Sequence, residues 1–237
     1  MNPMRLLLMS NSTNAGEEYL EYPKNDIKNF LGSQKVRSLF VPYAGITVTW
    51  DAYERKVMER FNQIGQEIIS IHHFDDPVKA VKEASAIIVG GGNTFRLAEL
   101  LHKNRLVEII RKRVNEGIPY IGWSAGANVA CPTICTTNDM PVVQPESFKT
   151  FGFVRFQINP HYLDANPDGH AGETREMRIE EYIEINQEIY VAGLREGSIL
   201  LKEGDNMSLL GTRTMRIFKY GTAAVEVGPE DDLSFLD

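Results

Sequence analysis

The sequence predicts an α/β protein, in which a mostly parallel sheet is flanked by helices and hairpin strands follow at the C-terminal end. Two patterns predict this class. Up to about residue 130, short apolar runs alternate with helical stretches, which is typical of right-handed βαβ units. From residue 189 on, short strands are separated by turns rich in Gly and Asn, which indicates hairpins.

The first half of the chain predicts five strands and the helices between them. Strands are expected at 5–10, 36–41, 67–71, 86–89 and 118–123, and helices at 24–31, 49–65, 77–84, 93–100 and 106–114. The helix at 49–65 has the clearest pattern, because Tyr53, Val57 and Phe61 recur at helical spacing and Gly65 can end it. His72 and His73 are expected to continue the third strand, so that they point to opposite faces.

The second half predicts a different organisation. A polar loop at 136–141 precedes a strand at 154–158 and a charged helix at 173–185, and further strands are expected at 189–192, 198–202, 207–210 and 215–219. Neither an internal repeat nor a linker rich in Ser, Gly or Pro divides the chain. We therefore expect a single domain over residues 1–237, with an acidic tail that frays from about residue 229.

Composition narrows the class of protein. The formal net charge is −7 over 237 residues, which disfavours nucleic acid and anionic membrane surfaces as partners. No apolar run approaches the length of a membrane span, and the run Arg5–Met9 is too short for a signal sequence. The two cysteines, Cys131 and Cys135, are expected to be small buried groups rather than a disulfide or a metal site. Such low cysteine content predicts a cytoplasmic protein.

The most informative stretch is Gly122–Gly126, Gly-Trp-Ser-Ala-Gly, which follows an apolar strand and precedes a helix. This is the G-x-S-x-G pattern of a nucleophile elbow, in which the serine hydroxyl of a strained strand-to-helix turn projects clear of the sheet. The following helix would point its N-terminus at that hydroxyl. The alternative is an ordinary βα turn in which Ser124 caps the helix.

A serine nucleophile requires a base and an acid that orients the base. His161 is the favoured base because it follows a strand and the stiff residue Pro160, with His170 as the second candidate. For the acid, Asp139 and Glu196 both lie in loops, and the sequence alone leaves the choice open.

The glycine run Gly90–Gly92, followed by Asn93, lacks the spacing of a phosphate-binding loop. It lies at the carboxyl end of a predicted strand, as does the elbow, and sites in parallel sheets form at that edge. We expect the backbone N–H groups near Gly92 and of Ala125 to form an oxyanion hole beside Ser124.

Several blocks of the chain together resemble the dipeptidase E (α-aspartyl dipeptidase, peptidase E) family of serine peptidases, which also contains cyanophycinase. The blocks are Val89–Phe95, Gly122–Asn128, Thr136–Pro141, Ile158–His161 and Gly172–Arg175. The resemblance runs from the first strand to at least Gly197 and thins over the last forty or so residues. It implies an α/β fold of the class I glutamine-amidotransferase type, and hydrolysis of dipeptides with an N-terminal aspartate.

Carried over by motif, the resemblance implies Ser124 as nucleophile and His161 as general base, without a metal or another cofactor. It ranks Asp139 first as the acid and keeps Glu196 as the other proposal. Arg175 is the expected partner of the substrate's aspartate side chain, because a guanidinium binds a carboxylate through two hydrogen bonds. The partner is thus a small dipeptide, and a homodimer is left open. The alternatives are a cyanophycinase-like β-aspartyl exopeptidase and a non-catalytic ligand-binding member of the fold.

Overall fold

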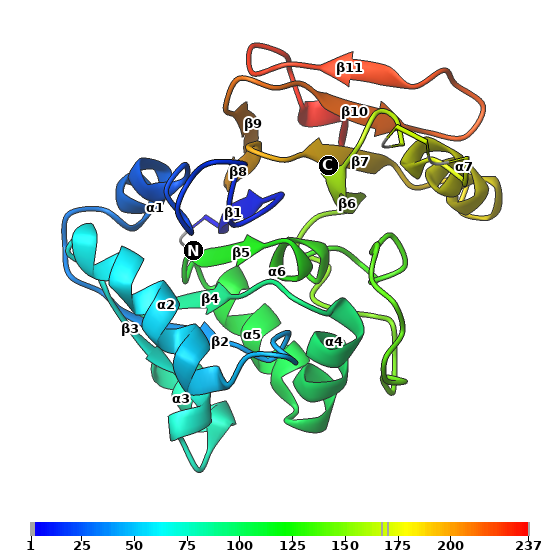
Figure 1. Ribbon diagram of the computed structural model, residues 1–237. Helices are drawn as coiled ribbons and strands as arrows, with labels where there is room; N and C mark the ends of the chain where they lie inside the picture. Colours follow the sequence, from blue (N-terminus) through cyan, green and yellow to red (C-terminus); the bar gives the residue numbers. More distant parts are fainter. Residues whose placement is uncertain (1–2, 167, 170, 237) are drawn as a thin grey trace.

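Two sheets organise the protein. A computed structural model describes residues 3–166, 168–169 and 171–236, and Figure 1 shows the smaller sheet above one end of the larger one. The larger sheet has seven strands in the order β3-β2-β4-β5-β1-β8-β9. Its strands are β1 (Arg5–Met9), β2 (Arg37–Val41), β3 (Glu67–Ser70), β4 (Ala86–Val89), β5 (Tyr120–Trp123), β8 (Ile199–Glu203) and β9 (Asn206–Leu210).

The first five strands of the large sheet are mutually parallel, whereas β8 and β9 are antiparallel additions beside β1. Alternate residues of β1 enter opposite cores: Leu6 and Leu8 lie in one buried cluster, and Leu7 and Met9 in the other. Both faces are therefore covered by helices, as a parallel sheet requires. The helices are α1 (Lys24–Leu31), α2 (Trp50–Gln63), α3 (Pro77–Glu83), α4 (Thr94–Lys103), α5 (Leu106–Asn115), α6 (Ala125–Asn128) and α7 (Arg175–Ile185).

Helices α1 and α2 cover one face of the large sheet, and α3, α4 and α5 cover the other. Thr49 caps α2 by accepting the N–H of Ala52, and Asp76 caps α3 before the proline at its first position. The α/β class predicted from the alternating pattern is confirmed. None of the helices in the described part of the chain has the length and apolar character needed to cross a membrane.

The smaller sheet has the strand order β11-β10-β7-β6. Its strands are β6 (Gln157–Tyr162), β7 (Val191–Arg195), β10 (Met215–Phe218) and β11 (Val225–Val227). Helix α7 packs on one face through Ile179 and Ile183, while Ile158 and Leu194 face the large core. The chain thus passes from β7 in the small sheet to β8 in the large one, a junction that becomes important for the site.

Several expected elements differ from those observed. The prediction of a hairpin between the strands near 189–192 and 198–202 is wrong, because they belong to different sheets; β8 pairs with β9 instead. The strand β11 has no counterpart in the predicted elements. Cys131 is buried, but Cys135 is exposed, contrary to expectation, and both are free.

The prediction that His72 and His73 lie in a strand is also wrong. Both belong to the short 3-10 helix η1 (Ile71–His73), and their ring centroids are 4.0 Å apart, so they point the same way. A second 3-10 helix, η2 (Ser234–Leu236), lies near the C-terminus, where Leu233 and Leu236 are buried. The single domain and the fraying of the tail in solution stay predictions.

Candidate active site

Ser124 occupies a strained turn between β5 and α6. Its backbone has φ 52° and ψ −113°, a conformation that residues other than glycine rarely adopt. The flanking glycines are required by space: a Cβ at Gly122 would lie 2.3 Å from the oxygen of Gly126, and one at Gly126 would lie 2.1 Å from that of Val89. The predicted strand–turn–helix context of the G-x-S-x-G motif is therefore present.

His161 approaches Ser124 from the small sheet. It lies at a register shift in β6, between Pro160 and Tyr162, with φ 53°. A bulge of this kind re-aims a side chain, and the edge position of β6 tolerates the proline. The imidazole Nε2 lies 3.0 Å from Ser124 Oγ. The predicted strand ended before His161, whereas the observed strand includes it.

Glu196 completes a chain of hydrogen bonds. It lies in the turn from β7 to β8, and its Oε1 is 2.6 Å from Nδ1 of His161. A proton on Nδ1 that is donated to Glu196 leaves the Nε2 lone pair free to accept the hydroxyl proton of Ser124. Of the residues predicted for the site, the structure thus brings Ser124, His161 and Glu196 together.

Asp139, the other predicted acid, forms its hydrogen bonds with Thr94 and Thr137. Its Oδ2 accepts hydrogen bonds from Thr94 N (2.7 Å), Thr94 Oγ1 (2.6 Å) and Thr137 Oγ1 (3.1 Å). These contacts tie the 136–141 loop to the first turn of α4. Within the described residues no hydrogen bond joins Asp139 to His161. The choice of the acid, for which Asp139 was ranked above Glu196, stays a prediction.

Two residues at the end of β1 were not among the predicted site residues. Ser10 is fully buried; its Oγ accepts the N–H of His161 at 2.9 Å and donates to the oxygen of Leu194 at 2.6 Å. Asn11 Oδ1 accepts the N–H of Gly197 at 2.9 Å. These side chains tie the end of β1 to β6, which carries His161, to β7 and to the turn that carries Glu196. The available signal was a polar pair directly after a buried strand, at the sheet edge where sites form.

The glycine turn after β4 lies beside the elbow. Tyr53 donates its hydroxyl proton to the oxygen of Gly91 at 3.0 Å, and Trp123 Nε1 donates to the Tyr53 hydroxyl at 3.1 Å. Because the peptide is trans, the N–H of Gly92 points away from Tyr53. A Cβ at Gly91 would lie 3.0 Å from that of Ser124, so this turn contacts the serine.

The second expected oxyanion donor is Ala125. Its N–H is the first of α6, a position that has no carbonyl partner within a helix. Helix α6 spans only Ala125–Asn128, so the expected contribution of a helix dipole is reduced to that of individual N–H groups.

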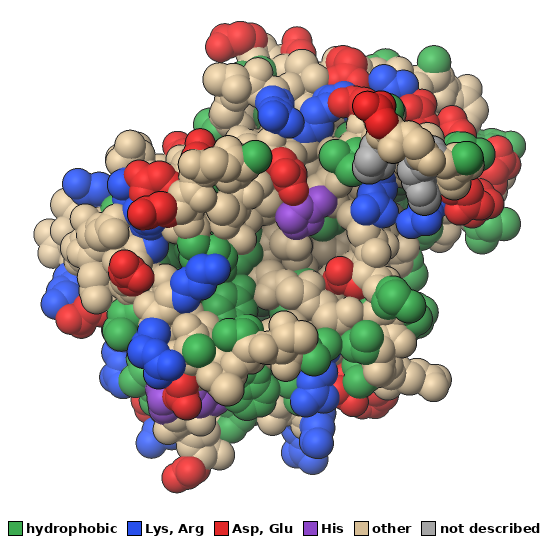
Figure 2. Space-filling view, in the orientation of Figure 1, with side chains coloured by type: hydrophobic (Ala, Val, Ile, Leu, Met, Phe, Trp, Pro, Cys, Tyr) green, Lys and Arg blue, Asp and Glu red, His purple; other side chains and the backbone are tan. Residues whose placement is uncertain are grey.

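A pocket of about 690 Å³ opens at Ser124 and His161. This volume suits a small ligand. Figure 2 shows the face concerned, which is hollowed near its centre, with hydrophobic side chains inside and charged ones around the hollow. Its lining also includes Ser12, Tyr19, Ala44, Gly45, Ile46, Thr47, Val48, Tyr53, Lys56, Gly91, Gly92, Asn93, Trp123 and Val142.

Arg175 is the first residue of α7 and does not belong to the lining of that pocket. Its guanidinium is partly buried, and desolvation lowers its pKa, with Arg178 acting in the same direction and Asp139 in the opposite one. Among the residues that the structure describes, none forms an ion pair or a hydrogen bond with the Arg175 side chain. His170, the second candidate base, lies outside the described residues.

Known proteins match this chain over most of its length. Relatives named peptidase E are 50% identical over 98% of this chain and 96% of theirs in Nostoc sp., and 47% identical over 98% and 95% in Streptomyces coelicolor. The peptidase E of Salmonella typhimurium is 45% identical over 94% of this chain and 96% of its own.

Solved structures share the fold. A peptidase from an acI-B1 Actinobacterium superposes with a TM-score of 0.71 at 19% identity, covering 99% of this chain and 98% of its own. A putative peptidase E from Listeria monocytogenes gives 0.64 at 19% identity, over 88% and 98%. The model of peptidase family S51 matches residues 6–210. The predicted enzyme class, a peptidase, is confirmed, and this chain belongs to peptidase family S51.

Proposed function

We propose that the protein hydrolyses dipeptides with an N-terminal aspartate through an aspartyl-enzyme formed on Ser124. The observation that carries this proposal is the hydrogen-bonded chain from Ser124 through His161 to Glu196, which opens into a pocket. The names of the relatives, peptidase E, support the same activity.

The reaction begins at the serine hydroxyl. His161 takes the proton through Nε2 as Oγ attacks the peptide carbonyl, and Glu196 stabilises the resulting imidazolium through Nδ1. The N–H groups of Gly92 and Ala125 stabilise the negative oxygen of the tetrahedral intermediate. His161 then protonates the leaving amine. A water molecule, deprotonated by the same histidine, hydrolyses the aspartyl ester and frees Ser124.

Glu196 is assigned the orienting role in place of Asp139. A carboxylate in this role must accept the Nδ1 proton of the base, and Glu196 lies within hydrogen-bond distance of that nitrogen. Asp139 instead accepts three hydrogen bonds at the start of α4, which gives it a structural task.

Arg175 is proposed to bind the side-chain carboxylate of the substrate's aspartate. A partly buried guanidinium that forms no ion pair or hydrogen bond with the described residues is costly, and a bound carboxylate relieves that cost with two hydrogen bonds. For the leaving residue of the substrate, Lys56 contributes a positive charge to the lining of the pocket. This charge suits the free carboxylate of the leaving residue, and so favours dipeptides.

The test is release of free amine from Asp-Leu, with Glu-Leu, Asn-Leu and β-Asp-Leu as comparison substrates. Cleavage of Asp-Leu alone supports the proposal. Cleavage of β-Asp-Leu in its place would favour the cyanophycinase-like β-aspartyl exopeptidase. Failure of the folded enzyme to cleave any of the four would favour a non-catalytic ligand-binding member of the fold.

Specificity is tested separately with Arg175→Ala. We expect KM for Asp-Leu to rise at least about tenfold, because a charge-assisted pair is worth about 1.5–3 kcal/mol. The matched control is Arg178→Ala, since that side chain is exposed and pairs with Glu173 at 3.5 Å. Equal effects of the two substitutions would remove Arg175 from substrate recognition. A cytoplasmic location and a homodimer stay predictions, testable by fractionation and by light scattering.

A further inference from the structure

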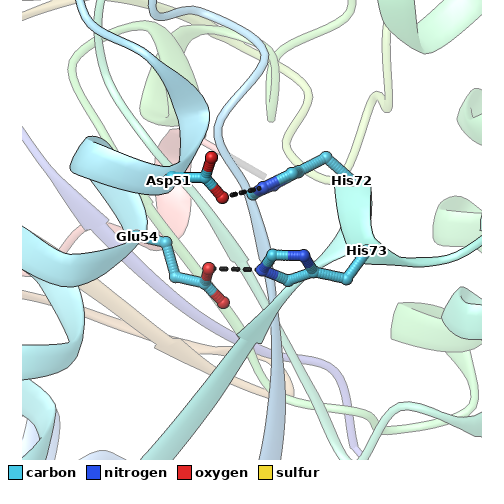
Figure 3. Close-up of side chains that lie close together, drawn as sticks. All are labelled: Asp51, Glu54, His72 and His73. Carbon is cyan, nitrogen blue, oxygen red and sulfur yellow. Dashed lines mark hydrogen bonds and ion pairs between the residues drawn. The ribbon is translucent and has the colours of Figure 1, made fainter.

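A second cluster of chemically active side chains lies apart from the peptidase site. Asp51 and Glu54 are three residues apart on α2 and so share one face of the helix. His72 and His73 approach them from η1. Figure 3 shows the two carboxylates facing the two imidazoles across the gap between these elements.

The four side chains form two hydrogen-bonded pairs that converge. Nε2 of His72 is 2.9 Å from Oδ1 of Asp51, and Nε2 of His73 is 2.6 Å from Oε2 of Glu54. One potential ligand atom from each residue lies within 4.8 Å of the other three. Two separate surface ion pairs would not need this convergence, which brings two carboxylates and two imidazoles together.

The donor set matches a particular class of ion. Two imidazole nitrogens and two carboxylate oxygens suit Zn²⁺, which takes four such ligands in a tetrahedron at bond lengths of about 2.0–2.2 Å. Ligand atoms around such an ion are about 3.3–3.5 Å apart. The four potential ligand atoms already lie within 4.8 Å of one another, which is close to that spacing.

The surroundings of the cluster already orient two of its ligands. Ser70 Oγ lies 2.6 Å from Nδ1 of His72, which fixes the ring and directs Nε2 toward Asp51. The backbone N–H of Ser70 donates to the second oxygen of Glu54 at 2.6 Å. Metal-binding histidines and carboxylates characteristically have such outer hydrogen bonds.

The exposure of the four side chains also fits a metal site. The side chain of Asp51 is 63% exposed and that of His73 is 43% exposed, so an ion can enter from solvent, whereas Glu54 and His72 are largely buried.

We infer that Asp51, Glu54, His72 and His73 form a binding site for Zn²⁺ or a similar transition-metal ion, which links the start of α2 to η1. The site is separate from the peptidase reaction, and its role is to hold α2 in place. That helix carries Tyr53 and Lys56, which line the pocket.

The experiment is titration of metal-free protein with Zn²⁺ by calorimetry and by thermal unfolding, with Mg²⁺ as the comparison ion. We expect one Zn²⁺ per chain to bind at this site and a higher unfolding midpoint with Zn²⁺ only. Substitution of Co²⁺ is expected to give the strong visible absorption of a tetrahedral complex.

Variants locate the ion. His73→Ala and Asp51→Asn change exposed side chains and should abolish both the binding and the thermal shift while amine release from Asp-Leu is kept. Ser70→Ala should weaken Zn²⁺ binding by about 10- to 100-fold through loss of the outer hydrogen bond. The control is His102→Ala. The His102 ring lies outside the cluster, and its Nε2 bonds the backbone oxygen of Lys149 at 2.9 Å.

Two results would overturn the inference. One is a wild-type protein that shows neither calorimetric binding nor a thermal shift with Zn²⁺. The other is Zn²⁺ binding of unchanged stoichiometry and affinity in both His73→Ala and Asp51→Asn, which would place the ion elsewhere. Retained amine release in the variants shows that they are folded, so loss of Zn²⁺ binding is then a property of the cluster.

Discussion

The 136–141 loop and the turn from β7 to β8 each carry a carboxylate, Asp139 and Glu196, but the two carboxylates make different contacts. Asp139 accepts hydrogen bonds from Thr94 and Thr137, so its acceptor capacity serves the start of α4. Glu196 projects from a turn that Ser10 and Asn11 hold against β6, and it reaches His161.

The difference shows that nearness to Ser124 in sequence does not determine which carboxylate lies beside His161. Asp139 is closer to Ser124 along the chain, whereas Glu196 comes from the crossing between the two sheets. In the small sheet β6 and β7 are parallel neighbours, and Tyr162 pairs with Arg195. His161 and Glu196, each adjacent in sequence to one of these two residues, are therefore brought close together. Pairing of strands therefore determines which carboxylate meets the imidazole.

Ser124→Ala is expected to have the largest effect and to define the baseline for the comparison. Loss of the attacking oxygen should lower kcat by roughly 10⁶-fold, the scale seen when a serine nucleophile is removed. The unfolding midpoint should stay close to that of the wild type, because only one hydroxyl is lost. Turnover of Asp-Leu by the purified variant at a rate near that of the wild type would exclude Ser124 from the reaction.

Glu196→Gln is expected to lower kcat by roughly 10²–10⁴-fold with little change in KM. An amide cannot stabilise the imidazolium, and it can stabilise the wrong tautomer of His161. The measurement is steady-state hydrolysis of Asp-Leu, with Glu196→Asp as a second variant that keeps the charge. A loss smaller than that of Asp139→Asn would reverse the assignment of the two carboxylates.

Asp139→Asn should act mainly on stability. Its amide can accept fewer and weaker hydrogen bonds from the first turn of α4, so we expect a loss of about 1–2 kcal/mol in the free energy of unfolding. The effect on kcat should stay within about tenfold. Denaturant unfolding, read beside the kinetics of the same sample, distinguishes this from a catalytic role.

Glu226→Gln should have the smallest effect of these variants, a small loss in the free energy of unfolding. Glu226 binds Arg195, which directly precedes Glu196. Arg195, the neighbour of Glu196, donates two hydrogen bonds to Glu226 at 2.8 and 3.0 Å and also pairs with Asp164. Hydrogen bonds, above all those from Arg195 and then those from Thr214 and Arg216, lower the pKa of Glu226 from its ordinary 4.5 to about 2.

A lowered pKa fixes the direction of the pH dependence. The stabilisation is present above pH 4.5 and is lost as the pH falls toward 2, where the folded carboxylate also binds a proton. Because the Glu226 side chain is 40% exposed, solvent screening limits its contribution to about 1 kcal/mol or less. Denaturant unfolding of wild type and variant at pH 7 and pH 3 should show the difference shrinking with acidity. A constant difference would mean that ionisation of Glu226 is not involved.

Local sequence patterns were sufficient to predict the elements that depend on residues close together in the chain. The alternation of apolar strands with helices predicted the five parallel strands, and the flanking glycines predicted the turn at Ser124, because only glycine leaves room for the backbones that meet there. His161 was identified from its place near the end of a strand. The bulge that aims it, and the hydrogen bond from its N–H to Ser10, arise from contacts across 151 positions.

The fold class, the strained turn at Ser124 and the family were predictable from the sequence, since they depend on periodicity, on glycine sterics and on blocks of adjacent residues. Three features emerged only in the folded protein: the carboxylate that meets His161, the place where the chain changes from the small sheet to the large one, and the approach of His72 and His73 to Asp51 and Glu54. The physical reason is the same in each case. Hydrogen bonds between distant segments depend on strand pairing and packing, which no local stretch of residues specifies.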